Sequence, residues 1–166
     1  MNPEQAITLV KYNTWANHRV LLKVLRLPEA RLTGRSTLSQ RPSSIHWFTF
    51  LTRSVLARRR AIRKPACENT GLFQFESLTA LKRRWDEEDI CLFLKYVQGL
   101  SANDLNGKVT YKWPQAWPRS RPLWNILQHI FNHGTHHRSE IGQYLATLSQ
   151  SPGDLDFIKF VGKAYQ

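Results

Sequence analysis

The chain has 166 residues, of which 42% are hydrophobic and 11% aromatic. This composition is typical of one folded domain and excludes a disordered chain. Lys and Arg number 24 against 12 Asp and Glu, so the formal net charge is +12. Such a charge permits attraction to nucleic acid, anionic lipid or an acidic metabolite without choosing among them, and a solvated basic surface is the simpler interpretation.

Apolar residues at helical spacing predict four long helices. Pro3 suits the first turn of the first helix, and Pro65 ends the second. Gly99 stands where a helix commonly ends in glycine. The predicted helices cover residues 3–26, 43–64, 77–98 and 122–148.

Residues 101–121 predict a short helical turn followed by a hairpin, because KVTYKW alternates as a strand does. Pro152 and Gly153 end the fourth long helix, and DLDFIKFV predicts one short terminal helix. The predicted fold is therefore an all-α four-helix bundle, a single domain over 1–166, with a short irregular or hairpin insertion before the last long helix.

Targeting and redox signals are weak. The N-terminus lacks the basic and then apolar pattern of a signal peptide, and no apolar run approaches the roughly 20 residues of a membrane helix. Cys67 and Cys91 form neither a disulfide framework nor a CxxC motif. We therefore expect a cytoplasmic protein with free thiols.

Four histidines fall within nine residues of the predicted fourth helix: His129, His133, His136 and His137. Residues four apart share a helix face, with Cβ atoms about 6 Å apart. His133 and His137 can therefore direct two imidazoles at one ion, and imidazole suits zinc, nickel, copper or iron. His129 and His136 remain alternatives at this point, and a third ligand must come from a neighbouring helix.

For several other histidine, tryptophan and asparagine side chains, we expect a structural role and not a catalytic one. His18 is expected at the surface and Trp15 in the core. Asn17 is expected as an amide on a helix surface, with a partner role beside a metal as the alternative. Trp113 and Trp117 alternate with Lys112 and Arg119, which would allow stacking on nucleic acid bases. A lid over the bundle or packing against a dimer partner is the preferred interpretation, so nucleic acid is the less favoured partner.

The segment at 123–158 contains NHGTHHRS at 132–139 and resembles the last helix of DinB-like proteins. The first helix is similar too, because KYNTWANHRVL at 11–21 looks like the YNRWAN signature of that family. The resemblance covers nearly the whole chain. It implies a four-helix bundle of the DinB/YfiT-like type, often a homodimer, with a divalent zinc or nickel ion held by three histidines.

By motif position, the resemblance assigns His133 and His137 as the two ligands from the last helix. The third ligand of such proteins follows SIH in the second helix, where this chain reads SIHWFTFLT at 44–52 and has Leu51 at the ligand position. Leucine cannot coordinate a metal. His46 is the nearest histidine, but five residues rotate a helix by about 140°, so it would have to lie on an irregular first turn. Glu140 or an external ligand is the alternative.

Two functional hypotheses follow. In the first, the metal acts as a Lewis acid in a thiol S-transferase or hydrolase-like enzyme that uses a low-molecular-weight thiol or another small molecule, as the resemblance implies. In the second, the chain is a metal-free binding or stress-response module whose basic surface contacts an anionic partner such as nucleic acid. Leu51 favours the second hypothesis, and the NHGTHHR motif favours the first.

Overall fold

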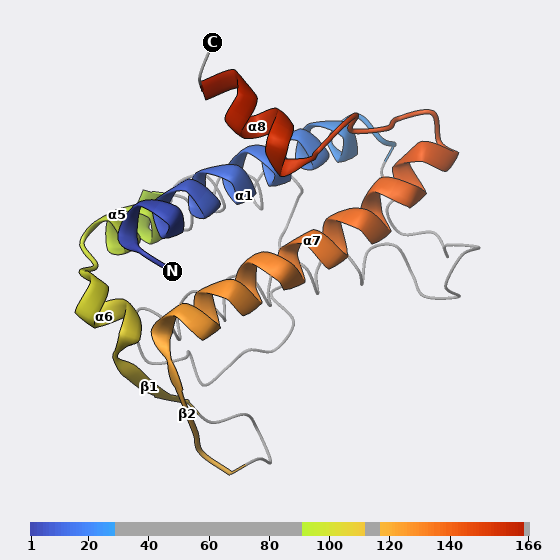
Figure 1. Ribbon diagram of the computed structural model, residues 1–166. Coiled ribbons are helices and arrows are strands. Elements are labelled where there is room, and N and C mark those ends of the chain that lie inside the picture. Colours follow the sequence, from blue (N-terminus) through green and yellow to red (C-terminus); the bar gives the residue numbers. More distant parts are fainter. Residues whose placement is uncertain (29–90, 112–116, 165–166) are drawn as a thin grey trace.

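The computed structural model describes residues 1–28, 91–111 and 117–164. This part of the chain is mainly helical, as predicted, and none of its helices is long and apolar enough to cross a membrane. The predicted second helix and most of the third lie outside it, so an arrangement of four helices in one bundle stays a prediction. The elements are α1 (Pro3–Val24), α5 (Cys91–Gln98), α6 (Ala102–Asn106), β1 (Lys108–Tyr111), β2 (Arg119–Pro122), α7 (Leu123–Thr147) and α8 (Phe157–Ala164) (Figure 1).

Helix α1 begins where the sequence predicts, because residues 2–5 form a capping box. The Asn2 side chain accepts from the Gln5 backbone N–H at 2.8 Å, and the Gln5 side chain accepts from the Asn2 N–H at 3.0 Å. Two of the N–H groups that a helix start leaves without partners are thereby satisfied. Pro3 needs no such partner, so it fits the first helical position.

Helices α1 and α7 are parallel neighbours. The backbone of Gly134 lies beside Asn13, and Arg138 lies beside Asn17, so contacts advance in the same direction along both helices (Figure 1). Helices α5 and α6 and strand β1 close one end of the pair. The core residues of this end come from five elements: Ala6, Val10, Phe93, Val97, Leu105, Val109, Leu123, Leu127, Ile130 and Phe131.

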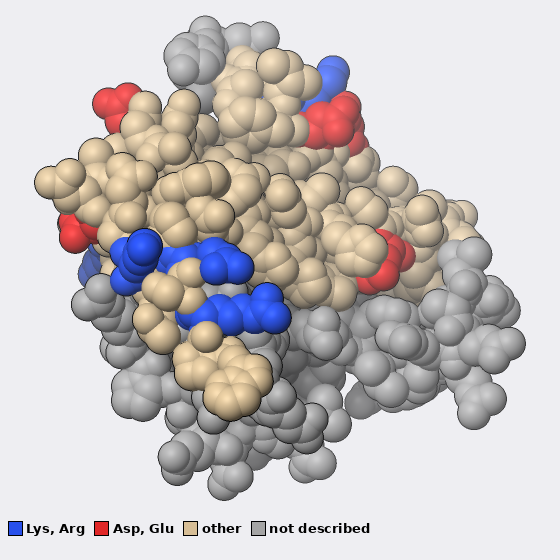
Figure 2. Space-filling view, turned by 60° about the horizontal axis from the view of Figure 1, so that its bottom comes forward, with Lys and Arg blue, Asp and Glu red and all other residues tan. Residues whose placement is uncertain are grey.

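The insertion before α7 is a short helix followed by a hairpin, as predicted. Ser101 and Asp104 cap α6 reciprocally, which fixes its start. Strands β1 and β2 are antiparallel, with Lys108 opposite Pro122 and Tyr111 opposite Arg119. Lysine and arginine side chains gather over this hairpin, with no acidic side chain between them (Figure 2).

The segment after α7 is held against α1 by side chains of the first helix. The Tyr12 hydroxyl donates to the Leu155 carbonyl at 2.9 Å, and Arg19 donates twice to the Pro152 carbonyl at 3.0 and 3.2 Å. Helix α8 begins at residue 157, three residues later than the DLDFIKFV pattern suggests. The Asp156 N–H donates to the Asp154 side chain, a local turn that competes with helix start at 154.

Gly153→Ala is expected to lower the free energy of unfolding by about 1–2 kcal/mol, because position 153 has a positive φ of 76°. A Cβ there would also lie 2.8 Å from the Arg19 guanidinium that holds the Pro152 carbonyl. The melting temperature should fall by roughly 2–8 °C in a thermal unfolding experiment. Gly162→Ala is the matched control, since a Cβ at that helical position meets nothing within 4 Å. Equal melting temperatures for the two variants would contradict this account.

Candidate metal centre

The histidines form a stripe along one edge of the buried face of α7. His129, His133 and His137 are one helical turn apart, so they lie nearly above one another. Burial rises along the stripe: His129 is exposed, His133 is half-buried and His137 is only 7% exposed. The rings of His129 and His133 stack with centroids 5.4 Å apart.

The structure brings the side chains of His133 and His137 together. Their Nε2 atoms lie 3.0 Å apart, and their rings are nearly perpendicular, with an interplanar angle of 77°. At this distance one imidazole donates a hydrogen bond to the other without a bridging water. Two imidazole nitrogens therefore converge on one point beside α7.

Glu140 contacts the far nitrogen of the His137 ring. Its Oε2 lies 2.9 Å from His137 Nδ1, and its Oε1 lies 3.2 Å from Nε2 of the exposed His136. An ionised carboxylate only accepts, so Nδ1 of His137 carries the proton and donates it. Glu140 is thus placed to orient His137. It is not placed beside the two converging Nε2 atoms, which argues against its alternative role as the third ligand.

Behind the histidines, Arg138 is buried to 2% exposure and joins α7 to α1. Its Nη1 donates to the side-chain oxygens of Asn13 at 2.7 Å and Asn17 at 2.9 Å. Its Nη2 donates to the Thr135 hydroxyl at 2.7 Å, and its guanidinium lies 5.4 Å from the centre of the Tyr12 ring. Because Arg138 follows His137 directly, this network fixes the rotation of α7 at the site.

The surroundings of Asn17, His18 and Trp117 differ in how far they agree with the sequence. The expectation that Asn17 is a surface amide is wrong, because Asn17 is 4% exposed and binds Arg138. His18 is exposed, as predicted. Trp117 is 88% exposed, so it does not form a lid over the bundle. The role of Arg138 was missed, although the i, i+4 amides at 13 and 17 were a detectable signal.

The structure does not describe the candidate third ligand. His46, and Leu51 at the position where the resemblance places a ligand, fall outside the described residues. Within 1–28, 91–111 and 117–164, no group of three His, Cys, Asp or Glu side chains is arranged to hold a metal ion. The described donors that converge are therefore His133 and His137, and a complete site needs a ligand from another segment or from solvent.

Asn125 extends the histidine stripe by one turn in the other direction. It lies four residues before His129, and its Oδ1 is buried with no hydrogen-bond partner in the structure as described. Buried polar atoms of native proteins are nearly always paired, so this oxygen is an exception among the described side chains.

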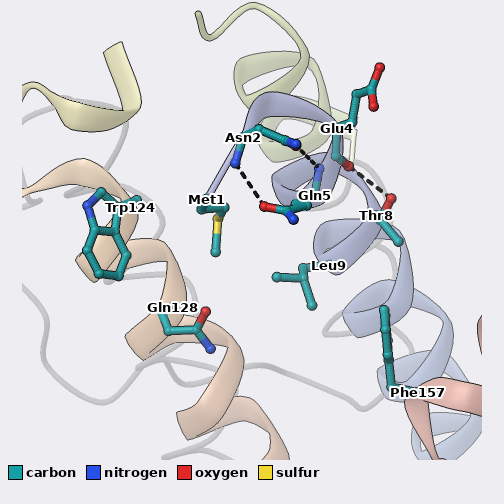
Figure 3. A pocket seen from close by; sticks show the side chains of 9 residues that line it. All are labelled: Met1, Asn2, Glu4, Gln5, Thr8, Leu9, Trp124, Gln128 and Phe157. Carbon is teal, nitrogen blue, oxygen red and sulfur yellow. Dashed lines mark hydrogen bonds between the residues drawn. The ribbon is translucent and has the colours of Figure 1, made fainter. Parts of the chain in front are cut away.

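A separate groove of about 710 Å³ lies between the first turns of α1 and α7 and reaches α8 (Figure 3). Met1 and Leu9 point toward Gln128 across it, and Trp124 and Phe157 also line it. Gln128 precedes His129, but one residue rotates a helix by about 100°, so the two side chains leave α7 in different directions. The groove and the histidine stripe are therefore distinct features.

Comparison with known proteins agrees with the family resemblance of the motifs at 11–21 and 132–139. The model of the DinB family matches residues 1–164. Protein DinB of Bacillus subtilis (strain 168) is 26% identical over 171 residues, a match that covers 95% of each chain. Because the family model spans nearly the full length, both the Asn13 and Asn17 helix and the histidine helix are included in the match. The chain therefore belongs to the DinB family.

Proposed function

We propose that this chain binds one divalent metal ion, zinc or nickel, through Nε2 of His133 and Nε2 of His137. The observation that carries the proposal is the 3.0 Å separation of these two atoms. Zinc–nitrogen bonds of about 2.0–2.1 Å in a tetrahedral site place two ligand nitrogens roughly 3.3 Å apart. A small opening of the pair would therefore admit the ion.

The contact with Glu140 supports the same role for His137. With the proton held at Nδ1 by the carboxylate, a neutral His137 presents a lone pair at Nε2. This pattern, in which a carboxylate orients a histidine and raises its basicity, is the usual surrounding of metal-binding imidazoles. We assign the third protein ligand to His46, with solvent or substrate completing the coordination.

The proposed reaction is transfer of a low-molecular-weight thiol, with hydrolysis as the related alternative. A bound metal would act as a Lewis acid and lower the pKa of a thiol or water. The half-buried His133 and the exposed His129 leave the stripe accessible from one side.

The first test is metal content by mass spectrometry on untagged protein after exposure to zinc and, separately, to nickel. We expect close to one metal ion per chain for the wild type and almost none for His133→Ala. His18→Ala is the matched control, because it removes an exposed histidine from α1. Absence of bound metal in the wild type would refute the proposal. Metal retained equally by His133→Ala would refute the assigned ligands.

A further inference from the structure

The β1–β2 hairpin belongs to a long stretch of the chain that carries no negative charge. From 105 to 139 the sequence contains neither Asp nor Glu. The basic residues of the same stretch are Lys108, Lys112, Arg119, Arg121 and Arg138. Arg138 is used inside the protein, so the positive charge that this stretch can offer to a partner is concentrated on the hairpin.

The structure places this charge at the surface. Arg119 and Arg121 are exposed and two residues apart in β2, so both lie on one face of the hairpin. Lys108 is exposed on β1 opposite Pro122, so its side chain leaves the hairpin on the other face, next to the start of α7. Figure 2 shows the resulting group of basic side chains in one view. Among the described residues, Arg119, Arg121 and Lys108 take part in no ion pair with an acidic side chain.

Beside this charge stands Trp117, two residues before Arg119 and 88% exposed. Tryptophan is usually well buried, so such exposure next to a group of cations indicates a contact with a partner. We propose that Trp117, Arg119 and Arg121 form a docking surface for single-stranded nucleic acid. The cations contact phosphates, and the indole stacks on a base, a combination that binds single strands without reading their sequence.

The distribution of apolar side chains favours nucleic acid over a lipid surface. A segment that lies on a membrane presents a row of apolar residues beside its basic ones. Among the described residues, the other exposed large apolar side chains are Leu22, Phe157 and Ile158, on α1 and α8. Among the side chains of the hairpin region that the structure describes, Trp117 is an exposed aromatic ring amid polar and basic groups, which suits a single base. This surface is separate from the histidine stripe, so the proposal stands independently of metal binding.

The test is fluorescence anisotropy of the full chain with a labelled 15-nucleotide oligo(dT), at several salt concentrations. We expect Trp117→Ala to weaken binding at least about fivefold, the effect of losing one stacked base, and Trp117→Phe to retain most of it. Arg119→Ala/Arg121→Ala should reduce the dependence of log affinity on log salt by about 1.4, since each phosphate contact on a single strand contributes roughly 0.7.

Lys11→Ala/Arg26→Ala is the control, because it removes the same charge from exposed positions on or just after α1. Circular dichroism verifies that each variant is folded. Equal losses in the control and in the hairpin variant would mean that binding follows net charge alone and would overturn the proposal. So would absence of binding by the wild type at 50 mM salt, or binding to vesicles of anionic phospholipid, through the same residues, in place of the oligonucleotide.

Discussion

Glu140→Gln is expected to weaken zinc binding roughly 10- to 100-fold, and His137→Ala to weaken it further. Glu140 does not approach the converging nitrogens, so its effect must pass through the His137 ring, which it contacts at 2.9 Å. Glutamine has nearly the same shape, but it lacks the charge that favours a proton on Nδ1. The rotated amide would instead favour a proton on Nε2, a form that cannot bind metal. Competition with a chromogenic zinc chelator measures both affinities.

The relative losses of zinc affinity in Glu140→Gln and His137→Ala distinguish a metal site from a cluster of histidines that only bond to one another. His18→Ala should bind zinc as tightly as the wild type, because this exposed side chain lies on α1. If Glu140→Gln left zinc affinity unchanged while His137→Ala abolished binding, Glu140 would have no orienting role. If neither substitution changed affinity, any zinc bound would lie elsewhere in the chain.

The helices that the structure describes could be predicted because local signals mark their ends. The prediction of 3–26 for the first helix differs from α1 (Pro3–Val24) by two residues at its C-terminal end, where no glycine or proline follows directly. The prediction of 122–148 agrees with α7 within one residue at each end. The start of α8 was less predictable, because the Asp154 side chain accepts from the Asp156 N–H in a local turn that precedes the helix.

The part of the candidate site that lies on a single helix could be predicted from the sequence. The i, i+4 spacing of His133 and His137 places them together whatever the rest of the fold does. Asn17 was mispredicted because its partner, Arg138, is 121 positions away, and periodicity cannot identify a contact between two helices. For Trp117, the expected lid over the bundle is wrong because the side chain is 88% exposed, whereas packing against a dimer partner stays a prediction.

Gly134 belongs to the histidine motif of α7 and also lies at the contact between α7 and α1. A Cβ at this position would lie 3.0 Å from the Asn13 side-chain oxygen and 3.1 Å from the Arg138 guanidinium. The glycine therefore permits α1 and α7 to approach closely enough for Arg138 to reach both asparagines. In the sequence, the glycine of NHGTHHR gives no helical advantage, since glycine weakens helix interiors. Its presence is explained by the contact between helices.

Arg138→Ala is expected to lower the free energy of unfolding by about 2–5 kcal/mol. The substitution leaves the buried oxygens of Asn13 and Asn17 without their donor, and each unsatisfied buried group costs about 1–3 kcal/mol. It also empties the space of a side chain that is 2% exposed. Urea unfolding followed by circular dichroism measures the change, and the melting temperature should fall by roughly 5–15 °C.

Two further variants decide whether the hydrogen-bonded network is the cause. Arg26→Ala removes an exposed arginine and should change stability by less than about 0.5 kcal/mol. Arg138→Lys keeps the charge but replaces a planar group with several fixed donors by a single ammonium, so it should recover only part of the loss. Full recovery with lysine would show that charge alone matters at this position. A loss for Arg138→Ala no larger than that for Arg26→Ala would show that α1 and α7 are held together by their apolar contacts, with the asparagines and Arg138 contributing little.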